Sequence, residues 1–261
     1  METIRERKAT EIATSDGKPL TKEAFVAALK AQSERYHHKH PLHVNMNAGR
    51  LNRTQIQIWV ANRYYYQAMI PAKDAAILSN CPYPAVRRVW IQRIIDHDGP
   101  AVGQGGIEDW LRFVDAVGLS REEVLDERHL LPGVRFAVDA YVTFARTRPW
   151  IEAVAASLTE LFAPDLMQKR IQAFERHYTW VDPKGLTYLK TRLKQAPRDA
   201  NHALELVTEY CRTGEQQERA LVALEFLSRC AFHSDKKVFN VSSNYLSDTL
   251  LTIYLYFVVK V

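Results

Sequence analysis

The chain has 261 residues, of which 47% are hydrophobic, enough to bury one sizeable core without requiring a second domain. Its 35 Lys and Arg against 30 Asp and Glu give a net charge of +5, which suits an acidic partner. The basic residues form no long run, and zinc-finger and RNA-binding motifs are missing, which argues against nucleic acid. A membrane protein is also not expected, since no apolar stretch reaches the ~20 residues that span a bilayer.

The first 20 residues are polar and aperiodic, so residues 1–20 are predicted to be a disordered leader without the apolar core of a secretory signal. A first helix is expected to begin near Thr21. A second opens at Asn52, with Gln55 as its capping partner, and Pro71 should kink it.

A third helix should stop at Gly99 in the left-handed α conformation, before a loop at residues 103–106. Ser120 and Glu123 predict a capping box at the start of another helix. The remaining helices are expected at about 107–117, 121–129, 133–147, 150–162, 164–177, 184–195, 197–212 and 215–229. Only 10 glycines and short loops favour an all-α bundle, with one helical catalytic domain over residues 21–229.

The end of the chain differs in composition. Residues 230–261 are rich in β-branched and aromatic side chains, and an uncharged run extends from Thr249 to Val259. This pattern is typical of a strand or an aggregation-prone segment. The segment is therefore interpreted as an atypical tail that replaces or alters the last helix, either as a foreign end or as a variant terminus.

The three cysteines, Cys81, Cys211 and Cys230, stand far apart and form no C-x-x-C pair. Such cysteines suit a reducing compartment, so a cytoplasmic protein is expected.

Polar residues occur at helical spacing on faces that should be buried. Arg63, Tyr66 and Gln67 lie at i, i+3 and i+4, and the pairs Arg93/His97 and Tyr188/Arg192 lie at i, i+4. Two interpretations remain open: a structural network with acids of neighbouring helices, or a clamp in which guanidinium and phenol groups bind carboxylates. His97, at a helix end, is expected to titrate near neutrality, as a general acid or base or as a cap.

Several phrases of the sequence together resemble the pyrroloquinoline-quinone synthase family, in the order in which that family has them. They are YHHKHPLH, WVANRYYYQAMIPAKDAAI, IQRIIDHDG, GGIEDWL, LPGVRFAVDAYVTFAR, SLTELFAP and RLKQAPRD. The resemblance covers about residues 21–226. It implies a haem oxygenase-like bundle of the seven-helix type, assembled as a homodimer, without haem, metal or organic cofactor.

The activity implied by the resemblance is the last step of pyrroloquinoline quinone biosynthesis. A small acidic substrate, a tricarboxylate, is closed into a further ring and oxidised by O2, with release of hydrogen peroxide. His97 would move protons, and Tyr188 and Arg192 would flank the oxygen site. Substrate-binding roles would fall to His37, Arg63, Tyr66, Gln67, Arg93, Tyr141, Glu160 and Arg170.

Two positions depart from the family pattern: Met167 replaces a histidine of the oxygen pocket, and Leu227 replaces a lysine. Methionine donates no hydrogen bond, so oxidation is expected to suffer more than binding. Two alternatives are kept. Glu34/His37 and Asp199/His202 have the E-x-x-H and D-x-x-H spacing of a di-iron oxidase, and a non-catalytic protein that binds an acidic metabolite would share the same pocket.

Overall fold

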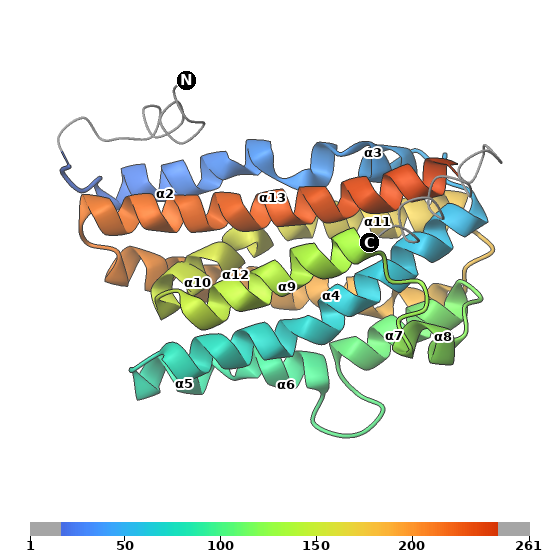
Figure 1. Cartoon of the computed structure of the whole chain (residues 1–261), viewed down its shortest axis with the longest axis horizontal. Helices are drawn as coiled ribbons and strands as arrows, with labels where there is room; N and C mark the ends of the chain where they lie inside the picture. The colour runs from blue at the N-terminus through green and yellow to red at the C-terminus, as the bar shows by residue number, and fades with distance from the viewer. Residues whose placement is uncertain (1–16, 245–261) are drawn as a thin grey trace, which may run out of the picture.

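All regular structure within residues 17–244, the part of the chain that the computed structural model describes, is helical (Figure 1). The side chains of His37 and of residues 242–244 are outside this description. The predicted all-α class is confirmed. The elements are α2 (Lys22–Ala31), η1 (Gln32–Arg35), η2 (His37–Lys39), α3 (Pro41–Asn47), α4 (Arg53–Asn80), α5 (Pro84–Trp90), α6 (Gln92–Asp98), α7 (Gly106–Ala116), α8 (Arg121–Leu125), α9 (Pro132–Thr147), α10 (Trp150–Ala156), η3 (Ser157–Phe162), α11 (Ala163–His177), η4 (Pro183–Leu186), α12 (Thr187–Tyr210) and α13 (Gly214–Asn244).

Two of the predicted helix starts carry the capping bonds expected of them. The Thr21 hydroxyl accepts a hydrogen bond from the Ala24 backbone N–H, and Asn52 and Gln55 form a reciprocal capping box at α4. The capping box predicted at Ser120 is wrong, because its side chain caps nothing and α8 ends at Leu125 instead of near residue 129.

One predicted helix end is also wrong, and a second is correct in position but not in backbone conformation. The break before Pro197 does not occur, and α12 runs through it, with Ala196 and Ala200 buried beside the proline. Tertiary packing of this face offsets the one backbone hydrogen bond that proline removes. Gly99 does end α6, but with φ 83° and ψ 156°, which is not the left-handed α conformation. A Cβ at Gly99 would lie 2.2 Å from the carbonyl oxygen of Gln104, so only glycine fits the turn.

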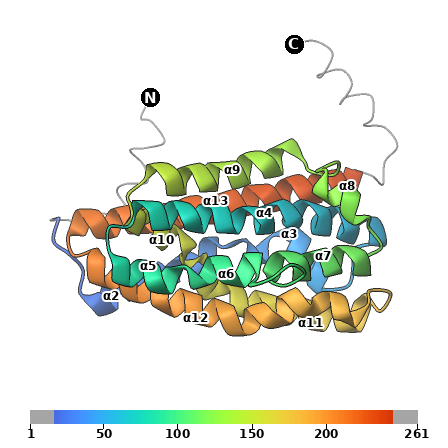
Figure 2. The ribbon, with the colours of Figure 1, turned by 90° about the horizontal axis from the view of Figure 1, so that it is seen from below.

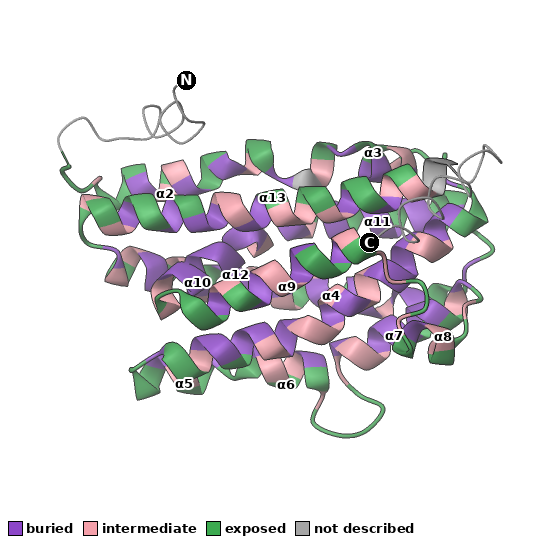
Figure 3. Ribbon diagram, in the orientation of Figure 1, coloured by how far each residue is buried: buried purple, intermediate pink, exposed green. Residues whose placement is uncertain are grey.

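The helices lie roughly along one common direction and bury their inner faces (Figures 1 and 3). One apolar cluster is centred on Trp59, Trp110 and Phe174, and a second contains Phe25 and Trp90. The partly buried side chain of Tyr66, on α4, packs against both clusters. The polar residues of α4 are thereby placed between two apolar clusters, where a charged side chain needs a hydrogen-bond or ion-pair partner.

The last helix contradicts the strand-like reading of residues 230–244. Helix α13 continues to Asn244 alongside α2 and α9 (Figures 1 and 2). Its buried face repeats at helical spacing through Leu224, Ser228, Asp235 and Val238. Burial of this face outweighs the β-branched composition of the segment. Residues 245–261, with the apolar run from Thr249, lie outside the described residues. None of the helices described is long and apolar enough to cross a bilayer.

Candidate active site

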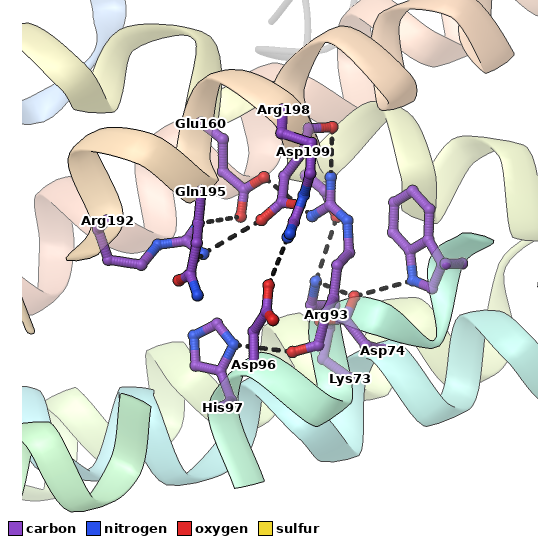
Figure 4. A network of polar contacts seen from close by, with 12 residues as sticks. Lys73, Asp74, Arg93, Asp96, His97, Glu160, Arg192, Gln195, Arg198 and Asp199 are labelled. Carbon is purple, nitrogen blue, oxygen red and sulfur yellow. Dashed lines mark hydrogen bonds and ion pairs between the residues drawn. The ribbon is translucent and has the colours of Figure 1, made fainter. Parts of the chain in front are cut away.

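Four charged side chains, three of them buried and one partly buried, form an ion-pair network between α6, η3 and α12 (Figure 4). Arg93 donates to the Glu160 carboxylate at 2.9 Å and to the backbone carbonyl of Asp199 at 2.6 Å. Arg192 contacts Glu160 at 3.2 Å and the Asp199 carboxylate at 3.1 Å. A buried guanidinium requires compensating charge and hydrogen bonds, and here the protein itself supplies both.

Three predicted site residues, Arg93, Glu160 and Arg192, are therefore brought together as partners of one another. Asp199 completes the group. Although burial opposes its ionisation, Arg93 and Arg192 hold the pKa of Asp199 below its usual value. Sequence reasoning considered Asp199 only as a metal ligand, but its position seven residues after Arg192, two turns along the same helix face, was a usable signal.

The acids considered for a metal site are engaged elsewhere. Asp199 is bound by Arg192 and Arg198, and Glu34 by Lys39. Within residues 17–244, no group of three or more His, Cys, Asp or Glu side chains is arranged to hold a metal ion. The geometry of the described residues therefore does not favour the di-iron alternative.

His97 lies at the C-terminal end of α6 and is buried. Its Nδ1 is 3.0 Å from the carbonyl oxygen of Arg93, which makes Nδ1–H the donor and leaves the lone pair on Nε2. That Nε2 is buried without a hydrogen-bond partner among the described residues. Burial, together with the positive charge of Arg192, lowers the pKa of His97 to about 4. The expectation that His97 titrates near neutrality is thus wrong, because burial outweighs the helix end.

Tyr188 lies near His97 and is hydrogen-bonded to Gln67. The Tyr188 hydroxyl donates to Gln67 Oε1 at 2.7 Å, while Gln67 Nε2 is buried and has no partner in the described part of the chain. A Cβ at Gly106 would stand 3.3 Å from the Tyr188 ring and 3.5 Å from the His97 ring. Gly106 therefore lets both rings approach the same point. Met167, buried in the same apolar cluster as Tyr188, adds no hydrogen-bond donor there.

A small cavity of about 30 Å³ lies between α4, α9 and α13. Three tyrosines and one arginine give it its polar character, and Leu227 is part of its wall. The lining residues are Tyr36, Arg63, Tyr66, Ala137, Val138, Tyr141, Thr159, Leu227, Cys230, Ala231 and Ser234.

The half-buried guanidinium of Arg63 lies 3.8 Å above the Tyr66 ring, at the cavity wall. It pairs with no carboxylate among the described residues, in contrast to Arg93 and Arg192. An arginine stacked on an aromatic ring keeps its N–H groups available for an anion.

Arg170, on α11, is a second cation without a direct carboxylate contact in the described part of the protein. It is buried, lies 5.1 Å from the Trp59 ring, and donates to His43 Nδ1 at 3.0 Å. His43 in turn passes its Nε2–H to Asp235 at 2.8 Å. Burial and the charge of Arg63 lower the pKa of Arg170 to about 10, which leaves it protonated at neutral pH. The two arginines thus repel each other, and an anion between them would relieve this cost.

Of the remaining predicted residues, Tyr66 and Tyr141 line the cavity and His37 belongs to η2, with no side-chain description. Sequence reasoning missed Tyr36, His43 and Asp235. Asp235 was hidden because it lies in the segment taken for a foreign tail.

Exchange of Asp235 for asparagine is expected to lower the free energy of unfolding by about 1–3 kcal/mol, since the buried His43–Arg170 pair then loses the carboxylate that accepts from His43. Chemical denaturation at pH 7 measures this. Glu218→Gln, the same charge change on an exposed position of α13, is the control. Equal stability of the two variants would show that the Asp235 carboxylate does not stabilise the fold.

The structure is thus an all-helical bundle with a tyrosine-lined cavity and, among the described residues, two arginines without a direct carboxylate contact, features typical of proteins that bind small anions. Within that class, the chain belongs to the TENA/THI-4/PQQC family, whose model matches residues 26–229. The match ends at the position where the sequence changes character.

Comparison with individual proteins agrees with this family membership. The chain is 56% identical over 207 residues to pyrroloquinoline-quinone synthase of Cronobacter sakazakii, covering 79% of this chain and 82% of that protein. It is 57% identical over 202 residues to the protein of the same name in Pseudomonas aeruginosa PAO1, covering 77% and 81%.

Two solved structures share the fold at low sequence identity. A domain of unknown function with a haem oxygenase-like fold from Shewanella denitrificans superimposes with a TM-score of 0.74 at 13% identity, over 88% of this chain and 97% of that one. A TenA homologue from Pseudomonas syringae reaches 0.69 at 12% identity, over 85% and 94%. The predicted haem oxygenase-like architecture is confirmed, although the described residues divide into more helices than seven.

Proposed function

We propose that this protein catalyses the final step of pyrroloquinoline quinone biosynthesis, ring closure of a tricyclic tricarboxylate and its oxidation by O2. The sequence identity to proteins named pyrroloquinoline-quinone synthase supports the reaction. Within the structure, the observation that carries the proposal is Arg63, a cation in a cavity wall without an anionic partner among the described residues.

In this proposal Arg63 and Arg170 bind carboxylates of the substrate, with hydroxyl donors from Tyr36 and Tyr66. A bidentate guanidinium–carboxylate pair fixes both the position and the plane of the bound group. Arg93 and Glu160 contribute by holding the neighbouring wall rigid through their own ion pair.

His97 would act as the base. Its Nε2 has no hydrogen-bond partner among the described residues, and its lowered pKa keeps the imidazole neutral at physiological pH, so the Nε2 lone pair is available to take a proton from a substrate carbon or nitrogen. The electrons leave the substrate for O2, which is reduced to hydrogen peroxide with protons released by the substrate. Tyr188 and the Arg192 charge stand near His97, where they would stabilise the negative charge that develops on reduced oxygen.

The proposal includes further properties that rest on the family resemblance: a homodimer, a cytoplasmic location, and no cofactor besides O2. The cytoplasmic location is in keeping with three cysteines that form no disulfide.

Anaerobic mixing of the purified protein with the tricyclic precursor, followed by admission of O2 in an oxygen-electrode cell, tests the function. The expected result is a quinone spectrum, oxygen uptake and peroxide release. Binding of the precursor without oxygen uptake would identify a sequestering protein, in line with Met167 and Leu227. The absence of any spectral change would refute the assignment, and activity that depends on bound iron would favour the di-iron alternative.

A further inference from the structure

Behind the cavity, a second pair of charges is buried within α4. Lys73 and Asp74 are 3% and 0% exposed, and Lys73 Nζ donates to Asp74 Oδ1 at 2.5 Å (Figure 4). The indole N–H of Trp90 donates to the same oxygen at 3.0 Å. Neither the ion-pair network around Arg192 nor the proposed chemistry uses this pair.

The pair is linked to the cavity through the buried hydroxyl of Ser157. This oxygen accepts from Lys73 Nζ at 3.4 Å, donates to the Ala153 carbonyl at 3.1 Å, and lies 3.1 Å from the hydroxyl of Tyr141. The Lys73 ammonium also lies 5.6 Å from the Tyr141 ring. Of the three hydrogen-bonded residues Lys73, Ser157 and Tyr141, only Tyr141 lines the cavity.

The direction of these bonds follows from counting hydrogens. An ammonium group only donates, and a serine hydroxyl has one hydrogen and two lone pairs. The hydrogen of Ser157 goes to Ala153, and one lone pair takes the bond from Lys73. The remaining lone pair is an acceptor, so all three contacts of Ser157 are satisfied together when the Tyr141 hydroxyl is the donor. The phenol oxygen of Tyr141 is then left with lone pairs alone.

We propose that Lys73 and Ser157 are positioning residues that hold Tyr141 as a hydrogen-bond acceptor, so that the cavity selects an anion that also carries an N–H or O–H donor. This inference rests on the proposed function and adds an orientation to it. The carboxylates of the ligand face Arg63 on α4, and its donor edge faces Tyr141 on α9. An amino-acid-derived heterocycle whose ring N–H stands beside a carboxylate has this chemistry.

Two fragments of nearly equal shape test the selection. Indole-2-carboxylate carries a ring N–H beside its carboxylate, and benzofuran-2-carboxylate has an oxygen in that place. Each is measured by displacement of pyrroloquinoline quinone from the full chain. We expect the unaltered protein to prefer the indole by about fivefold, the size of one neutral hydrogen bond.

The variants compare the two fragments within one protein, so a general change in stability or cavity shape cancels. Tyr141→Phe should abolish the preference. Ser157→Ala should abolish it as well, because Tyr141 is then free to turn its hydrogen toward the ligand. Lys73→Met/Asp74→Asn, which removes the ion pair without leaving a lone buried charge, should reduce it. Tyr64→Phe, on the same helix as Arg63 but away from the cavity, should retain it.

The outcomes separate the two claims. Failure of the unaltered protein to bind pyrroloquinoline quinone would overturn the proposed function, and the inference with it. Binding of the quinone with equal affinity for the two fragments, or with no displacement by either, would overturn the inference alone. A fivefold preference that survives Ser157→Ala would show that the Lys73–Ser157 chain is merely structural.

Discussion

Replacement of His97 by asparagine is expected to lower turnover of the tricyclic precursor by about 10²- to 10⁴-fold, with ligand affinity nearly unchanged. Asparagine retains a side-chain N–H that reaches the Arg93 carbonyl as His97 Nδ1 does, so the end of α6 keeps its bond. What the variant loses is the free lone pair on Nε2. Single-turnover absorbance measures the chemical step, and equilibrium titration with pyrroloquinoline quinone measures binding.

The pH dependence of turnover tests the same role of His97. Because the pKa of His97 is about 4, the basic form is present from neutral pH down to about pH 5, and kcat/KM should fall only as the pH approaches 4. An acid limb near pH 6.5 would contradict the buried, neutral histidine. Turnover by the asparagine variant at the rate of the unaltered protein would remove His97 from the chemistry.

Stability should respond to the same group. A histidine in the unfolded chain takes up its proton near pH 6.5, whereas folded His97 does so only near pH 4. The unfolded state therefore binds more protons between these values, and the free energy of unfolding falls as the pH drops from 6.5 to 4. His97→Asn should lack this part of the acid sensitivity, while His233→Asn, on an exposed position of α13, should keep it.

Exchange of Arg63 for glutamine is expected to weaken binding of pyrroloquinoline quinone by about 10- to 100-fold, the range for loss of a charge-assisted hydrogen bond. The reason is the missing anionic partner: among the described residues Arg63 contacts the Tyr66 ring but no carboxylate. Arg63→Lys keeps the positive charge but lacks the planar guanidinium group. Its affinity for pyrroloquinoline quinone should lie between those of the unaltered protein and the glutamine variant.

Arg88→Gln makes the same change of net charge on an exposed position of α5, so it controls for long-range attraction of the ligand. Titrations at low and high salt should show affinity lost in the Arg63 variant at both, since a half-buried contact is screened less than a surface one. Equal affinity of the Arg63 and Arg88 variants would mean that the ligand lies elsewhere.

Local signals were enough to predict much of the fold. Capping residues at Thr21 and Asn52 placed two helix starts, and short loops with few glycines indicated an all-α bundle. The failures share one cause. At Pro197, and in residues 230–244, local preference argues against a helix, but a buried face favours one and outweighs it.

The residue types of the candidate site could also be predicted from the sequence, but their pairing could not. The helical spacing of Arg63, Arg93 and Arg192 predicted that cations lie on buried helix faces. It did not indicate which of these arginines forms an ion pair with a carboxylate. Glu160 and Asp199 come from η3 and α12, and their approach to Arg93 exists only in three dimensions. The roles of the site residues in binding and turnover stay predictions until the variants are measured.

The sequence by itself determined that this protein is a helical bundle with arginines and tyrosines on inward faces, since hydrophobic periodicity and residue type are local properties. Only the tertiary structure decided how those charges are shared. It neutralised Arg93 and Arg192 with the protein's own acids, left Arg63 without one among the described residues, and lowered the pKa of His97. Ion pairing and desolvation depend on which side chains of different helices come into contact. The distances between those side chains are set by the packing of the helices.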